Sequence, residues 1–283
     1  DLTGMFKGCV KLEHPGNLTE GAEITDRMYE GCTSLKECCK LPSTVKSAVS
    51  MYYRCSSLEV AGELNEGLTD ASFMYSASGV VKMDNPLPST LKNIDSMFYC
   101  CKLKEIDWKI FDNVTIDSAK NAFTGCNKLV SIKGEINHIK DGTGLLSSCG
   151  FTVMPKFAAD NILEIADSMF GTGIGEYKKL ESYGGNTLPN SVKSMKYCFA
   201  YTDVTEVLPV PSGITDKNAF KGCYRNCTKL TDVSNMIDFI SSHTDTNDNS
   251  CFTDSLAITT PATAKELNEQ YSGWSFNHVT VPY

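Results

Sequence analysis

Apolar residues recur along the chain in one eight-residue motif, which opens with Met and an aromatic residue, places Cys fifth and ends with Leu. The motif occupies residues 5–12 (MFKGCVKL), 28–35 (MYEGCTSL) and 51–58 (MYYRCSSL), at an interval of 23 residues. Altered copies start on the same interval at Met74 and Met97, and looser remnants begin at Ala122, Leu145, Met169, Tyr197, Ala219 and Ser250. A fixed interval of this length predicts an internal repeat whose units stack on one another.

Flanking positions extend the pattern upstream of the motif. Counted from the first motif residue as position 0, position −6 is apolar, and its residues are Val45, Leu68, Leu91, Ile116, Ile139, Leu163 and Val192. Position −3 is small or apolar, and its residues are Ala48, Ala71, Ile94, Ala119, Gly142, Ala166 and Met195. Apolar residues at steps of three and four favour a short helical or 3₁₀ turn with one inner face.

Proline and the stretch after the motif complete each unit. Pro stands before the turn in segments such as 41–45 (LPSTV) and 87–91 (LPSTL), where its missing N–H costs little. Segment 58–64 (LEVAGEL) predicts a short, half-buried strand. Because none of these elements can bury its apolar face alone, neighbouring units must supply the core. We therefore expect residues 1–255 to form an α/β solenoid, a right-handed stack of about ten coils, each with a short strand and a short helical or 3₁₀ turn.

The C-terminal residues 256–283 leave the pattern. They predict a helix entered through Pro261, followed by Trp274, Phe276 and a terminal strand-like segment. A stack of coils needs a cap over its last apolar face, and Trp274 and Phe276 would cover the final coil. The alternative is a small separate recognition element, in which the two aromatic residues contact a partner.

Thirteen cysteines divide into two sets. Those on the fifth motif position are Cys9, Cys32, Cys55, Cys101, Cys126 and Cys149, with Ser78 in the fourth copy. A position fixed by the repeat is first a packing position, so we expect this ladder of thiols to be buried and mostly reduced. The remaining cysteines are better candidates for disulfides, with a connectivity that spacing leaves open: Cys38, Cys39, Cys100, Cys198, Cys223, Cys227 and Cys251.

Composition sets limits on the partners. The apolar share of 41% and charged share of 21% are ordinary for a folded domain. The net charge of −8 disfavours nucleic acid as a partner, although an acidic groove for a basic partner stays open beside simple solubility. No apolar run is long enough to predict a transmembrane segment. Because the first residues already carry the motif, we expect a mature or excised fragment.

No catalytic, cofactor-binding or metal-binding signature stands out. The run from Asp245 to Asp254 places acidic and amide residues as a calcium loop does, but Ser250 occupies the usual Gly position, so a solvated loop explains it equally well. The four histidines are scattered and lack zinc-ligand spacing. We therefore expect that the chain is not an enzyme and binds no cofactor. The alternative is an enzyme whose active site lies in the irregular region 171–254.

A binding face should form where a stack repeats its outward side chains. The charged candidates just after the motif are Lys36, Glu37, Glu59, Lys82, Lys104 and Glu105. The aromatic candidates are Trp108, Tyr177 and Tyr183, since exposed aromatic residues often anchor protein or sugar contacts. The mixed charge of this face also suits an ordinary solvated surface.

The recurring frame resembles the BspA-like class of bacterial leucine-rich repeats found in surface antigens. The likeness covers about residues 1–235, and it departs from the family by preferring Met before the aromatic residue and by losing Cys near Gly171–Gly175. It implies a leucine-rich-repeat solenoid at the cell surface or outside the cell. There it would act in adhesion or ligand capture, binding a protein or glycan of a host or neighbouring cell. The alternative is a structural spacer, or a tip component of a surface appendage that displays another domain.

Overall fold

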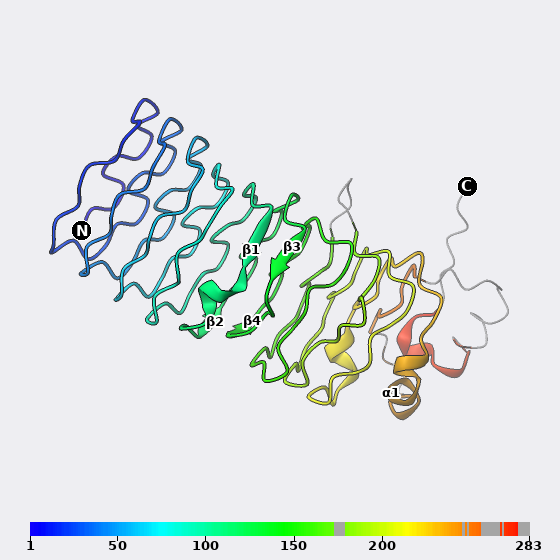
Figure 1. Ribbon diagram of the computed structural model, residues 1–283. Coiled ribbons are helices and arrows are strands. Elements are labelled where there is room, and N and C mark those ends of the chain that lie inside the picture. The colour runs from blue at the N-terminus through cyan, green and yellow to red at the C-terminus, as the bar shows by residue number, and fades with distance from the viewer. Residues whose placement is uncertain (173–178, 245–246, 248, 256–266, 268, 277–283) are drawn as a thin grey trace.

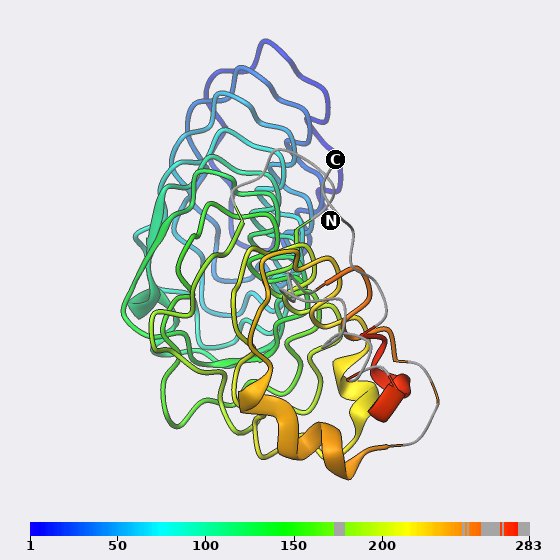
Figure 2. The same cartoon turned by 90° about the vertical axis from the view of Figure 1, so that its right-hand side faces the viewer.

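The chain winds through a stack of similar coils that runs from the N-terminus to the C-terminal region (Figure 1). The computed structural model describes residues 1–172, 179–244, 247, 249–255, 267 and 269–276. Seen from its C-terminal end, the stack shows successive coils nested behind one another (Figure 2). The repeat interval of the sequence therefore corresponds to one lap of the chain. The right-handed sense and the count of about ten coils stay predictions.

Regular elements are short in this stack. Two parallel strand pairs join β1 (Glu105–Asp107) to β3 (Ser131–Lys133) and β2 (Ile116–Ser118) to β4 (Ile139–Asp141). The 3₁₀ helices are η1 (Trp108–Phe111), η2 (Lys217–Phe220), η3 (Ser234–Met236) and η4 (Ser272–Trp274). The helix α1 (Ile237–Ser242) follows η3 directly.

Parallel bridges extend these strands into two ladders, of which the one before the motif is continuous and the one after it consists of separate pairs. One follows the motif, through bridges such as Val60 to Lys82 and Val153 to Ser182. The other precedes the motif and joins Ile24, Ser47, Asp70, Asn93, Ser118, Asp141, Ile165 and Ser194 in sequence. The sequence predicted the first ladder only. Polar residues in the second ladder concealed it, because they do not alternate with apolar residues as a half-buried strand does.

The motif itself folds as linked turns, so a short helical or 3₁₀ turn in every coil, as expected from the sequence, is wrong at the motif. In the second copy, Met28 N donates to Thr25 O and Cys32 N donates to Tyr29 O, so each bond closes a turn of four residues. The third residue of each turn has positive φ, 56° at Arg27 and 74° at Gly31. A left-handed residue interrupts a helix. Turns of this kind still advance in steps of three or four, which explains why the apolar spacing resembled that of a helix.

A column of stacked aromatic rings fills the core behind the motif. Tyr29 and Tyr52 lie 5.6 Å apart between ring centroids, and Tyr52 and Tyr75 lie 5.5 Å apart, with planes within 4° of parallel. The rings that share this column are Phe6, Tyr29, Tyr52, Tyr75, Phe98 and Phe123, and then Phe170, Phe199, Tyr224, Phe252 and Phe276. Leu146 takes the intervening position and interrupts the column. The backbone of each coil meanwhile binds the next, as where Tyr52 N donates to Met74 O.

The cysteine ladder lies beside this column and also acts as a row of donors. Cys55 Sγ donates to Tyr29 O at 3.1 Å, and Cys126 Sγ donates to Phe98 O at 3.0 Å, one coil back in each case. The same contact recurs at Cys32, Cys101, Cys149 and Cys227. These thiols are buried, whereas Cys9 in the first coil is exposed. Ser78 and Thr202 place a small hydroxyl side chain at this position, where Ser78 Oγ contacts Cys101 Sγ and Thr202 Oγ1 donates to Phe199 O of its own coil.

The expected disulfides among the remaining cysteines are absent, and all thirteen thiols are free. Cys198, Cys223 and Cys251 occupy position 0, where earlier coils have Met, and they are fully buried. In parallel coils these side chains point the same way, which is unsuitable for an S–S bond. Packing therefore accounts for this second cysteine row as well.

Aromatic side chains close the C-terminal end of the described stack. Phe276 stacks on Phe252 at 4.7 Å, and Trp274 lies 6.4 Å from the same ring. Trp274 Nε1 donates to His243 O at 3.0 Å, so its polar edge is satisfied. The two residues cover the last rings of the column. The helix and strand expected elsewhere in residues 256–283 lie mostly outside the described residues, so the cap boundary stays a prediction.

We predict that Tyr52→Ala lowers the free energy of unfolding by about 3–5 kcal/mol, because it removes a fully buried ring between two stacked neighbours. Urea denaturation measures this change. Tyr99→Ala removes a ring that is 41% exposed and serves as the matched control, with a change below about 1 kcal/mol. Equal losses in the two variants would show that the column does not carry the fold.

Buried thiols predict a pH dependence. Burial raises the pKa of Cys55 to about 12 and that of Cys101 to about 11, whereas an unfolded thiol has a pKa of about 8.5. The folded chain thus keeps protons that the unfolded chain loses, so stability is full below about pH 8.5 and falls as pH rises toward 11. Urea midpoints between pH 7 and 11 measure the effect. A flat profile, or alkylation of native Cys55 by iodoacetamide at pH 8 as fast as that of exposed Cys9, would contradict it.

Candidate functional site

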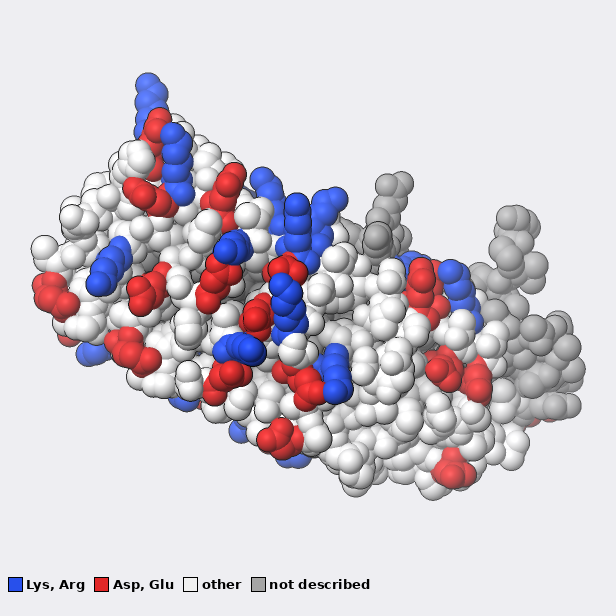
Figure 3. Space-filling view, in the orientation of Figure 1, with Lys and Arg blue, Asp and Glu red and all other residues white. Residues whose placement is uncertain are grey.

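The charged face predicted from the sequence lies along the ladder that follows the motif. All six candidates, Lys36, Glu37, Glu59, Lys82, Lys104 and Glu105, are exposed. Figure 3 shows acidic and basic side chains interspersed over the face that carries β1 and β3.

Many of these charges pair between coils. Lys36 Nζ lies 2.5 Å from Glu13 Oε2, and it holds the pKa of Glu13 below its usual value. Glu37 Oε1 lies 2.7 Å from His14 Nδ1, and Glu105 Oε1 lies 2.7 Å from Lys133 Nζ. Exposed pairs of this kind are screened by water and salt. The arrangement therefore favours the solvated-surface alternative for this face.

The aromatic candidates do not form surface anchors. Trp108 is buried, stacks on Phe111 at 4.4 Å, and donates from Nε1 to Asn137 O at 3.1 Å. Tyr183 is buried against Phe199, and its hydroxyl donates to Glu206 O at 2.9 Å. The expectation that these two residues are exposed is wrong, because both side chains fill widened parts of the core. Tyr177 lies outside the described residues.

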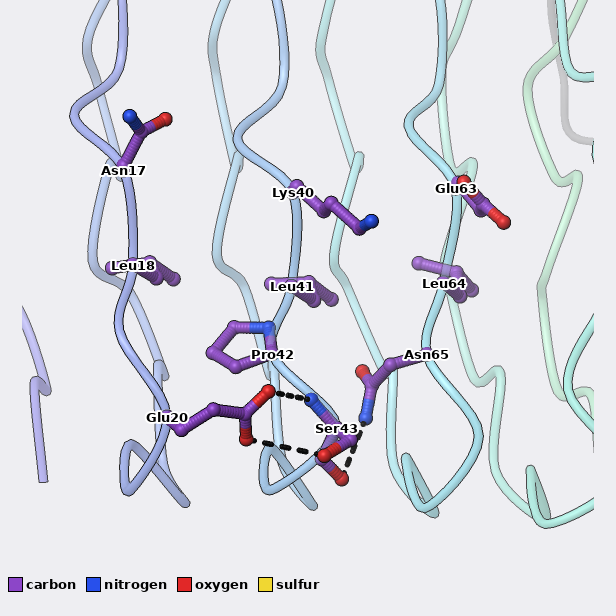
Figure 4. Close-up of a pocket in the computed structure, with 10 residues that line it drawn as sticks. All are labelled: Asn17, Leu18, Glu20, Lys40, Leu41, Pro42, Ser43, Glu63, Leu64 and Asn65. Carbon is purple, nitrogen blue, oxygen red and sulfur yellow. Dashed lines mark hydrogen bonds between the residues drawn. The ribbon is translucent and has the colours of Figure 1, made fainter.

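A groove of about 520 Å³ lies at the corner of three adjacent coils, around Leu41 and Pro42 of the middle coil (Figure 4). Leu18, Leu41 and Leu64 form one row across it, and polar side chains stand on either side. Several polar groups are already used to join the coils. Glu20 accepts from Ser43 N and Ser43 Oγ at 3.3 and 3.1 Å, and Asn65 Nδ2 donates to the Val45 carbonyl oxygen at 2.8 Å.

The corner groove recurs further along the stack, which argues for a structural origin. A smaller groove of about 360 Å³ forms at the corresponding corner around Leu188 and Pro189. The Glu20–Ser43 contact is repeated by Glu66, which accepts from Ser89 Oγ at 3.0 Å. We therefore attribute these corners to the Leu-Pro repeat rather than to one ligand.

A second groove, of about 440 Å³, lies over the motif turns and has no such repetition among the described residues. We call it the aromatic groove; its lining residues are Arg27, Glu30, Val49, Ser50, Tyr53, Phe73, Ser76, Ser96 and Tyr99. Phe73 is 43% exposed and Tyr99 is 41% exposed. The Arg54 guanidinium lies 5.0 Å from the Tyr53 ring centroid, which helps to hold that ring. Three aromatic rings thus gather on the surface of adjacent coils.

Phe73 is held in an unfavourable backbone conformation. It stands at position −1, where φ is positive in coil after coil, and its own φ is 56°. Several other coils place small or tolerant residues here, namely Gly4, Ser50, Ser96 and Asn121, although Arg27 and half-buried Tyr197 also stand at this position with positive φ. A bulky side chain with this φ costs about 1–2 kcal/mol. Strain at an exposed ring indicates a role other than folding.

Sequence reasoning missed the aromatic groove because it followed the positions that repeat. Tyr53 and Tyr99 stand at position +2 and Phe73 at position −1, neither of which belongs to the buried frame. The available signal was the presence of aromatic residues outside that frame in three consecutive copies. Outward positions that depart from the repeat are the ones free to carry recognition.

Metal and membrane sites receive no support from the described part of the chain. No cluster of three metal-ligating side chains occurs among those residues. Asp245, which opens the candidate calcium loop, lies outside them, and Asn249 instead donates to Lys217 O at 3.2 Å. Within the same described residues, no helix has the length and apolar character needed to cross a bilayer.

Short parallel ladders, a repeat that supplies one Leu per lap, and a stacked core define a leucine-rich repeat protein. The chain belongs to the BspA type leucine-rich repeat family, whose sequence model matches residues 71–173 and 176–279 in 6 copies. Among solved structures, it is similar to a leucine-rich repeat protein from Bacteroides ovatus, with a TM-score of 0.50 and 21% identity. That likeness covers 76% of this chain and 58% of the other, and it shows the fold alone. No curated protein matches the sequence.

We predict that Phe73→Asn leaves the free energy of unfolding unchanged or raises it by up to about 1 kcal/mol, because Asn tolerates positive φ and the lost ring is exposed. Phe73→Val should lower it by about 1–2 kcal/mol, since a β-branched residue is strained there. Urea denaturation compares the two variants. A loss above about 1 kcal/mol in the Asn variant would show that the ring stabilises the fold.

Proposed function

We propose that the chain is a non-enzymatic recognition module at the cell surface or outside the cell, and that the aromatic groove holds its ligand. The ligand would be a protein or a glycan of a host or neighbouring cell. The observation that carries this proposal is the strained, exposed ring of Phe73, which lines one groove together with Tyr53 and Tyr99. Exposed aromatic residues in a concave site are the common anchors of binding surfaces.

The chemistry of the groove supports binding rather than catalysis. Its lining combines rings, serine hydroxyls and one Arg–Glu pair, in which Arg27 Nε lies 3.8 Å from Glu30 Oε2. Glu30 also pairs with Lys7 Nζ at 3.1 Å. A carboxylate held between two cations is poorly placed to act as a general base, and the lining supplies neither His nor Cys as a second partner. The cell-surface location is supported by the family to which the chain belongs.

A structural spacer is the second candidate, and the ring column favours it. Stacked rings and the continuous ladder from Ile24 to Ser194 make a rod that could hold another domain away from an envelope. The two candidates differ in what a shortened chain can still do. A spacer depends on length alone, whereas a recognition module depends on the coils that form the groove.

We predict that removal of one repeat abolishes ligand binding only where the repeat carries the groove. Deleting residues 74–96 joins Phe73 to Met97 in register and removes Ser76 and Ser96, whereas deleting residues 122–144 removes an equally long repeat elsewhere. Fluorescently labelled full-length chain and both deletions are applied to an array of extracellular proteins and glycans, with circular dichroism as the folding control. We expect binding by the full-length chain and the second deletion alone.

Two outcomes would contradict the recognition proposal. One is an array on which the full-length chain binds nothing. The other is binding that survives deletion of residues 74–96 unchanged, which would place recognition outside the aromatic groove.

A further inference from the structure

The floor of the aromatic groove contains hydroxyl groups that the protein itself does not use. Ser76 is 2% exposed and Ser96 is 7% exposed, and both line the groove together with half-buried Ser50. No hydrogen bond joins any of these three hydroxyls to another described residue. Serine hydroxyls elsewhere in the core bind across coils, as Ser47 Oγ does to Asp26 at 2.6 Å. The groove therefore offers hydroxyl donors and acceptors that can form hydrogen bonds with a bound ligand.

The hydroxyls lie among aromatic rings, and the two features together restrict the ligand. Tyr53 and Tyr99 come from the same motif position two coils apart, with Ser76 at that position between them. A small residue between two large ones leaves room for a ring-sized group. Phe73 borders the same space from position −1.

We propose that the aromatic groove binds a neutral hexopyranose ring, which rests on the proposed function and names its ligand class. A pyranose has an apolar C–H face that packs on aromatic rings, and equatorial hydroxyls at its edge that can bind Ser50, Ser76 and Ser96. One ligand thereby satisfies both features of the groove.

An aromatic side chain from a protein partner fits less well. It would fill the space between the rings, but it would cover the three hydroxyls without giving them a partner. Each buried hydroxyl left without a hydrogen bond weakens binding. A saccharide would therefore supply hydrogen-bond partners for the three serine hydroxyls, whereas a purely apolar contact would not.

The charge of the lining favours a neutral sugar over an acidic one. Arg27 and Glu30 are the charged lining residues, and they offset each other. Glu30 is further engaged by Lys7. The Arg54 guanidinium lies over the Tyr53 ring and is not part of the lining. We therefore expect affinity to depend little on salt.

The test uses the full chain and isothermal titration with a panel of neutral linear oligosaccharides built from glucose, mannose or N-acetylglucosamine. At least one member should bind. Phe73→Asn should weaken that binding about tenfold or more, and Ser76→Ala about three- to tenfold, without loss of stability. Val60→Ala is the matched control, because Val60 is 52% exposed on the other ladder, and it should bind as the unchanged chain does. Raising NaCl to about 1 M, where charge effects are screened, should leave the affinity unchanged.

The array described above separates the possible failures. A glycoprotein that loses binding when its glycans are removed enzymatically supports the inference and identifies a protein-borne source, whereas binding to polysaccharide spots identifies a free one. Binding to unglycosylated proteins that Phe73→Asn abolishes, with no saccharide bound in the titration, overturns this inference and leaves the proposed function in place. Saccharide binding that is unchanged in Phe73→Asn and Ser76→Ala also overturns it. An array without any bound ligand removes both proposals.

Discussion

The structure depends on each coil satisfying the backbone of its neighbour. A single coil has turns and short strands that leave N–H and C=O groups pointing along the stack, and the next coil binds them in register. The ring column and the thiol row sit at the same joint. Tyr52 illustrates the coupling: its backbone binds Met74, its ring lies between Tyr29 and Tyr75, and its hydroxyl accepts from Cys39 N at 3.0 Å. Packing and hydrogen bonding are therefore specified by the same residue.

This coupling explains why the motif tolerates some changes and not others. Its aromatic position needs a flat ring of fixed placement, so Phe and Tyr exchange freely there, with Leu146 as the exception. Its fifth position needs a small side chain with a donor, so Cys, Ser and Thr exchange there. The positions at −1 and +3 need positive φ, and their residue types range from Gly and Ser to Arg, Phe and Tyr. The proposed recognition at Phe73 uses position −1, where the repeat constrains the backbone more than the side chain.

The fold was largely predictable from the sequence, and the candidate site was not. Periodicity identifies the buried frame because stacking repeats one environment many times, as at Leu58 and Ala71, which are both fully buried. The same periodicity predicted a helical or 3₁₀ turn where the structure has linked turns, because both place apolar residues three or four positions apart. Trp108 and Tyr183 were placed on the surface because they fall off the frame, whereas local widening of the coils buries them. Phe73 was overlooked because the prediction followed the positions that repeat, and position −1 carries no repeated aromatic residue.

Leu146 gives the rod a mechanical character that the regular coils would not have. The ring column ends at Phe123 and resumes at Phe170, so the two joints on either side of the Leu146 coil are held without stacked column rings. In a stack held by nearest-neighbour contacts, we expect these two joints to be weaker than their neighbours and to separate first under tension. The aromatic groove lies wholly on the N-terminal side of these joints. A force applied from the C-terminal side would then separate the coils next to Leu146 first. The aromatic groove would keep its shape while the stack lengthens.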